Sequence, residues 1–406
     1  MPLFRLAEKR IRSEIGQNKN PFSNLKIAAC LHVSKETSVL IKSLSDFGAK
    51  VRLVAANPLS SQTEIIAYLC SKGIDVRAKR SETESEYSHE ILRAARSEPE
   101  MIIDDGGELH VAYSKTRSRS CIGGTDETTS GTTRLRALVR NRKLRYPVIA
   151  VNEASTKHIF DNKYGTGQSA LDGLLRATGL LIAGKSVVVA GFGWVGSGVA
   201  LRARGMGARV IVTEVDPVKA LEAHLEGYEV MRMDEASHLG EIFLTCTGQT
   251  TVIGEKDFLK MRDGAIIANV GHFDLEIDVR ALYRISDTIE QVRENVGRFE
   301  IHPNKGKSES KSLFLLNQGR VVNLGSAEGH PPEVMQLSFA NQLLCLYYLV
   351  KNRAKLKQFE NSVIGVPDEI DQLVANLSLS AFNIRIDKLS RKQRRYATSF
   401  NLPGSA

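Results

Sequence analysis

Short apolar runs alternate with segments of helical periodicity along the first 160 residues. Apolar segments that we predict to be strands, with the residues that follow them, lie at 25–33, 50–58, 74–78, 101–107 and 146–155. Helical stretches lie between them, reaching to about Phe47 and covering 62–71, 87–97 and 127–142. Since strands that alternate with helices form parallel sheets with helices on both faces, the pattern predicts an α/β fold.

The pattern changes little after residue 163. A connecting helix is predicted over 163–181, and further apolar runs follow at 186–190, 241–248, 264–274 and 319–331. A long apolar helix over 334–350 then comes after Pro331 and Pro332, and we expect it to return to the first domain. The predicted organisation is a discontinuous first domain (1–163 and 332–362), a second domain (164–331) and a short helical C-terminal tail (363–406), with hinges near 155–170 and 330.

The stretch Ser186–Asp216 carries the most specific motif. An apolar strand ends at Gly191-Phe192-Gly193-Trp194-Val195-Gly196, a helix follows, and a second strand ends at Glu214. In such a β-turn-α-β unit Gly191 makes the tight turn, Gly193 lets a pyrophosphate approach, and Gly196 lets helix and strand pack. The backbone amides of the loop, including those of Trp194 and Val195, bind the pyrophosphate. Glu214 accepts from a ribose diol and repels a 2′-phosphate, which favours NAD over NADP, so we predict doubly wound, Rossmann-like parallel sheets in both domains.

Composition narrows the class of protein. The 406 residues are enough for two domains, and 42% hydrophobic with 25% charged residues is ordinary globular composition. We find no run long enough to span a membrane and no signal peptide, so we expect a cytoplasmic protein with no membrane partner. The five cysteines form no CxxC pair, which argues against a disulfide framework or a metal site. Of the net charge of +9, residues 351–406 supply +5 without a recognition motif, so we expect no nucleic-acid partner.

Polar side chains gather at the predicted carboxyl ends of strands. His32, Asn57, Asp105 and Asn152 all lie there, which is where open α/β sheets place their sites. Each also has a plainer interpretation, because Asp126 or Thr128 can cap a helix and Asp-Asp-Gly-Gly can be a turn. Taken one by one, these residues favour the plainer interpretation.

Taken together, the polar segments resemble the signature blocks of the S-adenosylhomocysteine hydrolase family. The resemblance runs from about residue 24 to 345 and is weak in the tail. It is carried, in order, by LHVSKETSVLI, DDGGEL, DETTSG, ASTKHIFDNKYG, GFGWVGSG, TEVDP, LTCTG, NVGHFDLEID and NLGSAEGHP.

This resemblance implies a compact archaeal or bacterial type of member that holds one NAD tightly. In the family's reaction NAD takes a hydride from the ribose 3′-carbon, a base removes the acidified 4′-hydrogen, homocysteine leaves, water adds, and the hydride returns. The expected function is therefore reversible hydrolysis of S-adenosyl-L-homocysteine to adenosine and L-homocysteine. The expected partners are these small molecules and, from the family's habit, three further copies in a homotetramer.

The implied catalytic residues are His32, Asp105, Glu127, Lys157, Asp161 and His272. Lys157 and Asp161, one helical turn apart, suit a base and a cation beside the ribose hydroxyl, and burial is expected to lower the pKa of Lys157 for the first task. Asp105 and Glu127 correspond to the groups that reach the 4′-hydrogen. His32 is expected to titrate near neutral pH for protonating the leaving thiolate or activating water, and His272 to meet the 3′-oxygen.

The resemblance also implies binding residues. On the substrate side these are Ser34, Glu36, Thr37 and Gln62 near the purine, Asn152, which orients Lys157, and His330, which gates the entrance. On the cofactor side they are Thr128, Thr129, Asn162 at the nicotinamide amide, the glycine loop, Glu214, Lys219, Thr247 and Asn323.

Several positions depart from the family pattern. Thr166 stands where many members have cysteine, Trp194 and Ser197 replace an Asp and a Lys, and Lys219 stands where an Asn is common. Glu328 lies where the family often has Met, next to the expected purine pocket. The usual Lys-Pro-Asp and terminal Tyr-Arg-Tyr are missing after Tyr396, which weakens the tetramer expectation.

Three alternatives stay open at this point. An S-inosyl-L-homocysteine hydrolase differs at the purine 6-position, where Glu36 must change partner or protonation state. A 2-hydroxyacid-type dehydrogenase shares the architecture but not the Lys157–Asp161 pair or DDGG. A non-catalytic regulator of the same fold is disfavoured because all six implied catalytic residues are present.

Overall fold

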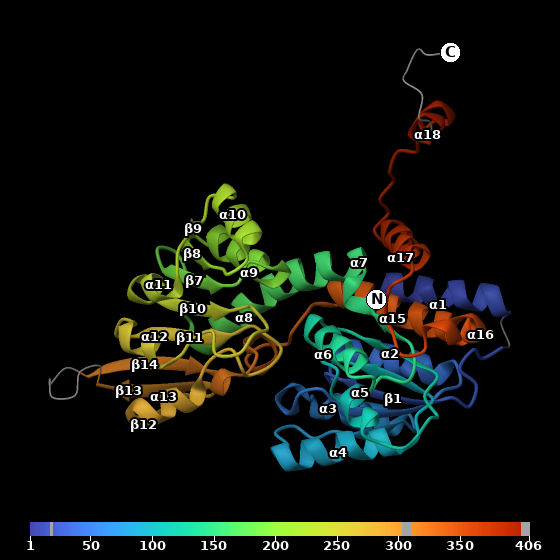
Figure 1. Cartoon of the computed structure of the whole chain (residues 1–406), viewed down its shortest axis with the longest axis horizontal. Helices are drawn as coiled ribbons and strands as arrows, with labels where there is room; N and C mark the ends of the chain where they lie inside the picture. Colours follow the sequence, from blue (N-terminus) through green and yellow to red (C-terminus); the bar gives the residue numbers. More distant parts are fainter. Residues whose placement is uncertain (17–18, 303–309, 399–406) are drawn as a thin grey trace.

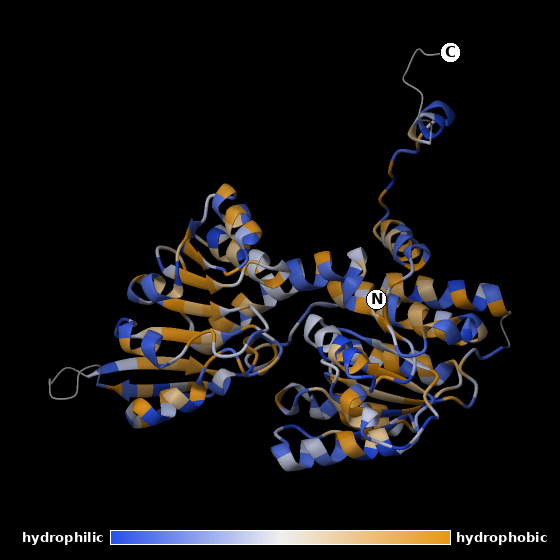
Figure 2. Ribbon diagram, viewed as in Figure 1, coloured by the Kyte–Doolittle hydropathy of each residue, from blue (hydrophilic) through white to orange (hydrophobic). Residues whose placement is uncertain are grey.

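Two α/β domains lie side by side in the computed structural model, joined by a helix (Figure 1). The structure describes residues 1–16, 19–302 and 310–398. In each domain most of the central strands are strongly hydrophobic, while many of the surrounding helices mix hydrophobic and hydrophilic residues (Figure 2). This is the distribution expected when a sheet is covered on both faces.

The sheet of the first domain is parallel throughout, with the order β15-β6-β5-β4-β1-β2-β3. Its strands are β1 (Lys26–Leu31), β2 (Lys50–Ala55), β3 (Asp75–Arg77), β4 (Met101–Asp104), β5 (Gly123–Asp126), β6 (Val148–Ala150) and β15 (Val363–Gly365). The order reverses direction beside β1 and β4, and ligands bind at such a switch point in open α/β sheets.

Alternate residues of β1 enter two separate cores. Ile27, Ala29 and Leu31 pack with α1 (Pro2–Ile15), α2 (Lys35–Asp46), α15 (Pro332–Lys351) and α17 (Asp368–Ala381). Ala28 and Cys30 pack on the other face with α4 (Glu84–Arg96), α5 (Glu108–Ser114) and α6 (Thr129–Arg140). Both faces are covered, which explains why the strand reads as an unbroken apolar run.

One continuous helical stretch connects the domains. It consists of α7 (Ser155–His158), a wider π-helical turn over Ile159–Gly165 and α8 (Thr166–Thr178). The predicted boundary at 163/164 lies inside this stretch. Single π-turns inside α-helices are frequent at functional sites.

The second sheet has the order β12-β13-β14-β11-β10-β7-β8-β9. From β14 to β9 it is parallel in the Rossmann order, with β7 (Ser186–Ala190), β8 (Arg209–Thr213), β9 (Glu229–Val230), β10 (Ile242–Thr245), β11 (Ala265–Asn269) and β14 (Lys311–Leu316). The hairpin of β12 (Ser286–Arg293) and β13 (Val296–Ile301) adds an antiparallel edge that the sequence pattern did not predict.

Along the sequence, the helices of the second domain mainly alternate with its strands. They are α9 (Trp194–Gly205), α10 (Pro217–Leu225), α11 (Met233–Leu239), α12 (Glu255–Lys260), α13 (Val279–Ile285) and α14 (Val322–Gly325). The predicted α/β fold with two doubly wound sheets, the first of them discontinuous in sequence, is therefore confirmed.

The predicted start of the tail at residue 363 is wrong. Residues 363–365 pair with β6, and α17 packs against α1 and α15, so this segment completes the first domain. Only α18 (Arg391–Ala397) stands apart from both domains (Figure 1), and residues 399–406 of the predicted tail lie outside the described residues. None of the helices described is long and apolar enough to cross a membrane.

Candidate active site

The glycine loop after β7 has the geometry of a pyrophosphate site. Gly191 has a φ of 96°, which favours glycine, and a Cβ on Gly196 would lie 1.9 Å from the Gly191 carbonyl oxygen. A Cβ on Gly193 would meet nothing nearer than Lys219 Nζ at 3.9 Å, so space is open there. Since α9 begins at Trp194, the first-turn amides of Trp194, Val195 and Gly196 have no partner within the helix and face an anion's position.

Glu214 closes the second strand of this unit. Its carboxylate accepts the backbone N–H groups of Phe192 at 2.7 Å, Val215 at 2.6 Å and Asp216 at 3.0 Å. Burial opposes ionisation, but these backbone donors outweigh it and lower the pKa of Glu214. An ionised carboxylate accepts hydrogen bonds only, which suits a ribose diol. The residues of this unit therefore fit NAD.

Lys157 is the centre of a buried polar cluster at the start of the connecting helix. Its Nζ donates to Asn152 Oδ1 at 3.0 Å, Asp161 Oδ1 at 3.2 Å and Asn162 Oδ1 at 2.9 Å. Glu127 Oε1 lies 3.7 Å away. These contacts use all three N–H donors of an ammonium group, so Lys157 is held in its charged form.

The expected lowering of the Lys157 pKa is wrong. Burial does lower it, but the charges of Asp161 and Glu127 together outweigh burial, and the net pKa is raised. The same pairing, with help from His330, keeps the pKa of Asp161 well below its ordinary value in spite of burial. Lys157 is thus arranged as a cation for a developing oxyanion, and it can act as a base only after passing a proton to a neighbour.

Glu127 is the neighbour that can exchange a proton near neutral pH. Burial raises its pKa to about 7, although Lys157 acts in the opposite direction. Ser338 donates to Oε1, and Gln342 Nε2 donates to Oε2 at 2.5 Å. Both partners come from α15, and neither was predicted from the sequence; the available signal was their spacing of four residues on a long, mostly apolar helix.

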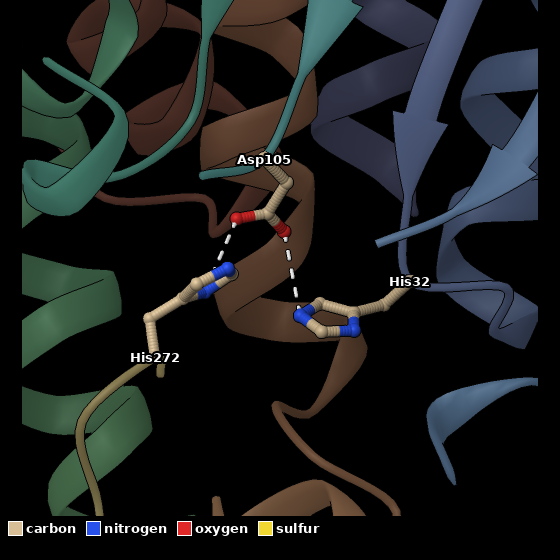
Figure 3. Close-up of side chains that lie close together, drawn as sticks. All are labelled: His32, Asp105 and His272. Atoms are coloured by element: carbon tan, nitrogen blue, oxygen red, sulfur yellow. Dashed lines mark ion pairs between the residues drawn. The ribbon is translucent and has the colours of Figure 1, made fainter. Parts of the chain in front are cut away.

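Asp105 lies between two histidines from different domains. Its Oδ2 is 3.5 Å from His32 Nε2, on the same domain, and its Oδ1 is 3.7 Å from His272 Nδ1, on the loop after β11 (Figure 3). Asp105 Oδ1 is buried and accepts no hydrogen bond from the described residues. A buried carboxylate oxygen without a donor fits a role toward a ligand.

The hydrogen bonds around His32 assign its tautomer. Ser60 donates its hydroxyl to the Asn57 carbonyl at 2.8 Å, so Ser60 Oγ accepts from His32 Nδ1 at 2.7 Å. Nε2 is then the unprotonated nitrogen that faces Asp105. The expectation that His32 titrates near neutral pH is wrong, because burial outweighs the attraction of Asp105 and lowers its pKa to about 4.

The comparisons with known proteins point in one direction. The model described as "S-adenosyl-L-homocysteine hydrolase" matches residues 7–121, and that of its NAD binding domain matches 162–329. An adenosylhomocysteinase of Sulfurisphaera tokodaii is 50% identical over 95% of this chain and 91% of its own length. The chain belongs to the S-adenosyl-L-homocysteine hydrolase family. A relative of Aeropyrum pernix, also named adenosylhomocysteinase, is 49% identical over 95% and 91% of the two chains. One of Methanocaldococcus jannaschii, named S-inosyl-L-homocysteine hydrolase, is 45% identical over 98% and 92%.

In this member of the S-adenosyl-L-homocysteine hydrolase family, His330 lies against the connecting helix. Its Nδ1 is 3.4 Å from Asp161 Oδ2, and its Nε2 is 3.1 Å from Thr166 Oγ1. Thr166, which departs from the family pattern, therefore supplies a hydrogen-bond partner for the predicted gate residue. The Asn152 amide donates to Thr129 Oγ1 at 2.8 Å, and Asn162 donates to Asn152 at 2.9 Å.

The residues predicted to face the purine surround the start of α2. Ser34 caps this helix by accepting the Thr37 N–H at 3.3 Å, and Glu36 lies half-buried in its first turn. The Gln62 N–H donates to the Val33 carbonyl at 3.0 Å, which brings the two loops together. Ser34, Glu36, Thr37 and Gln62 thus share one edge of the first sheet with His32.

The remaining predicted cofactor residues adopt mixed roles. Thr128 caps α6 by accepting the Gly131 N–H at 3.2 Å, which is the plainer interpretation made from sequence. Thr247 is held by Glu276, which accepts its N–H at 2.8 Å and its hydroxyl at 2.7 Å; Glu276 was not predicted from the sequence. Asn323 donates to Ser169 at 3.2 Å, while its Oδ1 is buried without a donor among the described residues.

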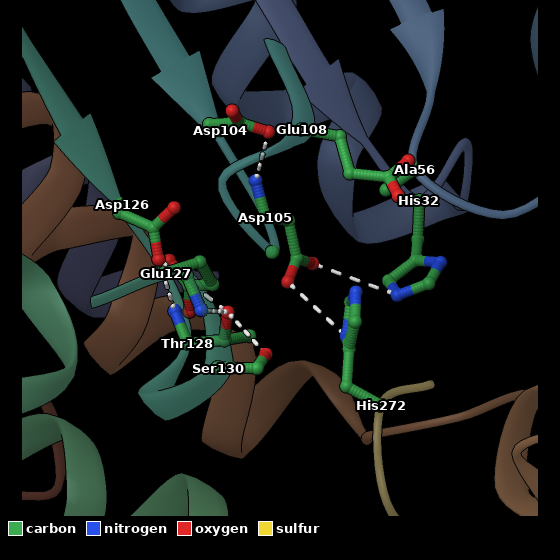
Figure 4. Close-up of polar contacts among 12 residues, drawn as sticks. His32, Ala56, Asp104, Asp105, Glu108, Asp126, Glu127, Thr128, Ser130 and His272 are labelled. Atoms are coloured by element: carbon green, nitrogen blue, oxygen red, sulfur yellow. Dashed lines mark hydrogen bonds and ion pairs between the residues drawn. The ribbon is translucent and has the colours of Figure 1, made fainter. Parts of the chain in front are cut away.

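Asp104 and Asp126 form a buried acidic pair next to the Asp105 turn (Figure 4). They are direct neighbours in the pairing of β4 with β5 and both are fully buried. Burial raises the pKa of Asp104 to about 8 and that of Asp126 well above its ordinary value. Asp104 accepts the N–H groups of Asp105 at 3.0 Å and His110 at 2.8 Å, so it shapes the turn that carries Asp105.

Proposed function

We propose that this chain catalyses the reversible hydrolysis of S-adenosyl-L-homocysteine to adenosine and L-homocysteine. The observation that carries the proposal is the pair of clusters at the domain junction: a fully hydrogen-bonded Lys157 beside Glu127, and Asp105 between His32 and His272. The first suits oxidation and reduction at the 3′-carbon. The Asp105 cluster suits removal and return of the 4′-proton, and the departure and re-addition of the leaving group.

Each group has one task in this proposal. NAD, when bound by the glycine loop and Glu214, supplies the hydride acceptor. Lys157 stabilises the charge that develops on the 3′-oxygen. Glu127, which the family resemblance assigned to the 4′-hydrogen, here takes up and returns the 3′-hydroxyl proton instead, because it lies 3.7 Å from Lys157 and has a pKa of about 7. Asp161 keeps Lys157 charged and in place through its 3.2 Å contact.

The second cluster acts after the ribose is oxidised. Asp105 Oδ1, which has no donor among the described residues, accepts the 4′-proton. His32 is neutral at pH 7 because its pKa is lowered to about 4, so its free Nε2 can accept a proton from water when water adds. His272 contacts the 3′-oxygen from the second domain.

An S-inosyl-L-homocysteine hydrolase is the second candidate. The 45% identity to the relative of that name supports it. Glu36 argues for the adenosyl substrate, because a carboxylate accepts from the purine amino group but not from a carbonyl oxygen. Ser34, Thr37 and Gln62 are the other residues that we assign to the purine, and Asn162 and Asn323 to the cofactor.

Assembly and location belong to the same proposal. We expect a homotetramer in the cytoplasm, with domain boundaries near 163/164 and 331/332. The family's usual assembly supports the tetramer, and sedimentation of the holoenzyme measures it.

The decisive experiment compares the two thioethers. The NAD-loaded protein is incubated with S-adenosyl- and S-inosyl-L-homocysteine while thiol release and nicotinamide absorbance are followed. We expect thiol release without net accumulation of reduced cofactor, faster with the adenosyl compound. Stoichiometric reduction of NAD without thiol would refute the proposal and favour a dehydrogenase.

A further inference from the structure

Arg134 on α6 makes a contact between the two domains that none of the functions above uses. Its guanidinium carbon lies 3.9 Å from the ring centroid of Phe273, which follows His272 on the loop after β11. Arg134 belongs to the first domain and Phe273 to the second. A cation over an aromatic face at this distance is attractive, more so when both groups are partly shielded from water, as here.

The first domain holds the Arg134 side chain in place. Its Nη1 donates to the Gly106 carbonyl at 3.3 Å and to Glu108 Oε1 at 3.2 Å. Glu108 in turn accepts the Tyr87 hydroxyl from α4 (Figure 4 shows Glu108 beside this turn). Because Gly106 directly follows Asp105, Arg134 is fixed to the turn that carries the catalytic carboxylate.

The loop of the second domain is equally constrained. Asn269 accepts the Gly271 N–H at 2.8 Å and donates to the carbonyls of Gly271 at 3.1 Å and Phe273 at 2.8 Å. The rings of His272 and Phe273 meet edge to face with centroids 4.5 Å apart. A force on Phe273 therefore moves His272 with it.

The two turns meet without room for a larger residue. A Cβ on Gly106 would lie 2.5 Å from His272 Nε2. Glycine at 106 thus permits the approach of His272 to Asp105, and Arg134 on Phe273 supplies attraction at the same place.

We propose that Arg134 is a positioning residue that seats His272 against Asp105 by stacking on Phe273 while bound to Gly106 and Glu108. This inference rests on the proposed hydrolysis for its effect on rate, but its structural part does not. Arg134 acts through Phe273 and makes no contact that assigns it to the purine side.

The test uses Arg134→Met in the NAD-loaded enzyme, with Arg134→Lys as the conservative variant. Misplacing a catalytic group by about 1 Å costs up to ~100-fold, so we expect kcat to fall about 10- to 100-fold with KM changed far less. Lysine keeps the cation but loses the planar fork, so it should restore part of the rate.

Arg136→Met is the matched control. Arg136 is on the same helix and pairs with Glu153 inside the first domain, with 58% of its side chain exposed. The Arg136→Met substitution removes the same charge without changing the contact between the domains, so we expect kcat close to wild type. An equal loss in Arg136→Met and Arg134→Met would overturn the proposal, as would an Arg134→Met enzyme with the wild-type kcat.

Phe273→Leu provides a second route that does not depend on how Arg134→Met folds. It should lose about as much kcat as Arg134→Met, and the double variant should lose little more than either, because both remove one contact. Fully additive losses would contradict the inference.

A readout without turnover separates this inference from the proposed function. Hydrogen exchange of the NAD-loaded protein should be faster in peptides 104–109 and 270–276 of Arg134→Met, and unchanged in Arg136→Met. If wild type hydrolyses neither thioether but the exchange result holds, the hydrolysis fails and the positioning contact stands. If the wild type hydrolyses a thioether but exchange in these two peptides is unchanged in Arg134→Met, the hydrolysis stands and the positioning role of Arg134 is refuted.

Discussion

The Lys157 cluster and the Asp105 cluster are built in contrasting ways. Lys157 makes its three hydrogen bonds at 2.9 to 3.2 Å, and their acceptors Asn152, Asp161 and Asn162 lie within one stretch of eleven residues of the chain. Asp105 stands 3.5 and 3.7 Å from its two histidines, and one of them belongs to the other domain.

The difference shows which part of the site has its geometry fixed within one segment and which part depends on the relative position of the two domains. A buried ammonium with all donors used is held by local sequence, so domain movement changes it little. Long contacts across a domain interface change with any small rotation. We infer that the oxidation step is preorganised and that the elimination step depends on how the domains meet.

Lys157→Ala gives the largest expected effect and tests the preorganised half. Removing the cation should slow ribose oxidation by about 100- to 1000-fold while NAD stays bound. The measurement is reduction of the cofactor after mixing the holoenzyme with adenosine. Lys185→Ala, which breaks an ion pair with Glu241 at 2.8 Å in the second domain, is the control. Normal cofactor reduction in Lys157→Ala contradicts the assigned role.

Asp105→Asn tests the other half. The amide cannot accept the 4′-proton, so we expect the cofactor to be reduced as in wild type while thiol release falls about 100-fold. The two variants should thus stop the reaction at different stages. Loss of cofactor reduction in Asp105→Asn would mean that the clusters are not separable.

Asp126→Asn examines the buried acidic pair next to the Asp105 turn through stability. The folded-state pKa of Asp104 is about 8 and that of Asp126 is also raised, so the folded protein binds more protons than the unfolded chain between pH ~4 and ~8. The free energy of unfolding therefore falls as the pH rises through this window, by up to about 1.4 kcal/mol per pH unit for each group. Asp126→Asn should flatten this slope in denaturant titrations, and Asp46→Asn on the exposed end of α2 should not.

Glu328→Met gives the smallest expected change. Glu328 is 61% exposed and pairs with Lys35 at 2.5 Å, so its carboxylate is engaged away from a buried purine. We expect the ratio of kcat/KM for the adenosyl and inosyl thioethers to stay within about twofold, whereas Glu36→Gln should move it about tenfold or more. A larger change in Glu328→Met would place that residue in the purine pocket.

The strands that are buried on both faces of their sheet could be predicted from the sequence. The unbroken apolar runs at 25–33 and 186–190 became β1 and β7, and the glycine loop formed between β7 and α9 as expected. The hairpin β12–β13 was missed because β12 is exposed along nearly its whole length and has no apolar run to read. β15 is only three residues long, too short to carry a periodic signal.

In the site, too, some features could be predicted from the sequence and others could not. Residue types in long blocks predicted Asp105, Lys157 and His272 as site residues, and the fold brings them to one junction. The ionisation of His32 and Lys157 was predicted wrongly because a pKa is a balance between burial and nearby charges, which depends on distances that no motif contains. Ser338 and Gln342 lie more than 200 positions from Glu127 in the chain, so no local pattern joins them to it.

The return of α15 and β15 to the first sheet also sets an order of assembly during synthesis. All strands of the second sheet have been made once residue 316 has left the ribosome, whereas the first sheet still lacks β15 and the helix that carries Ser338 and Gln342. Domains generally fold as units as the chain emerges. The domain that begins later in the chain is therefore complete earlier, and Glu127 meets its partners Ser338 and Gln342 only after α15 has been made.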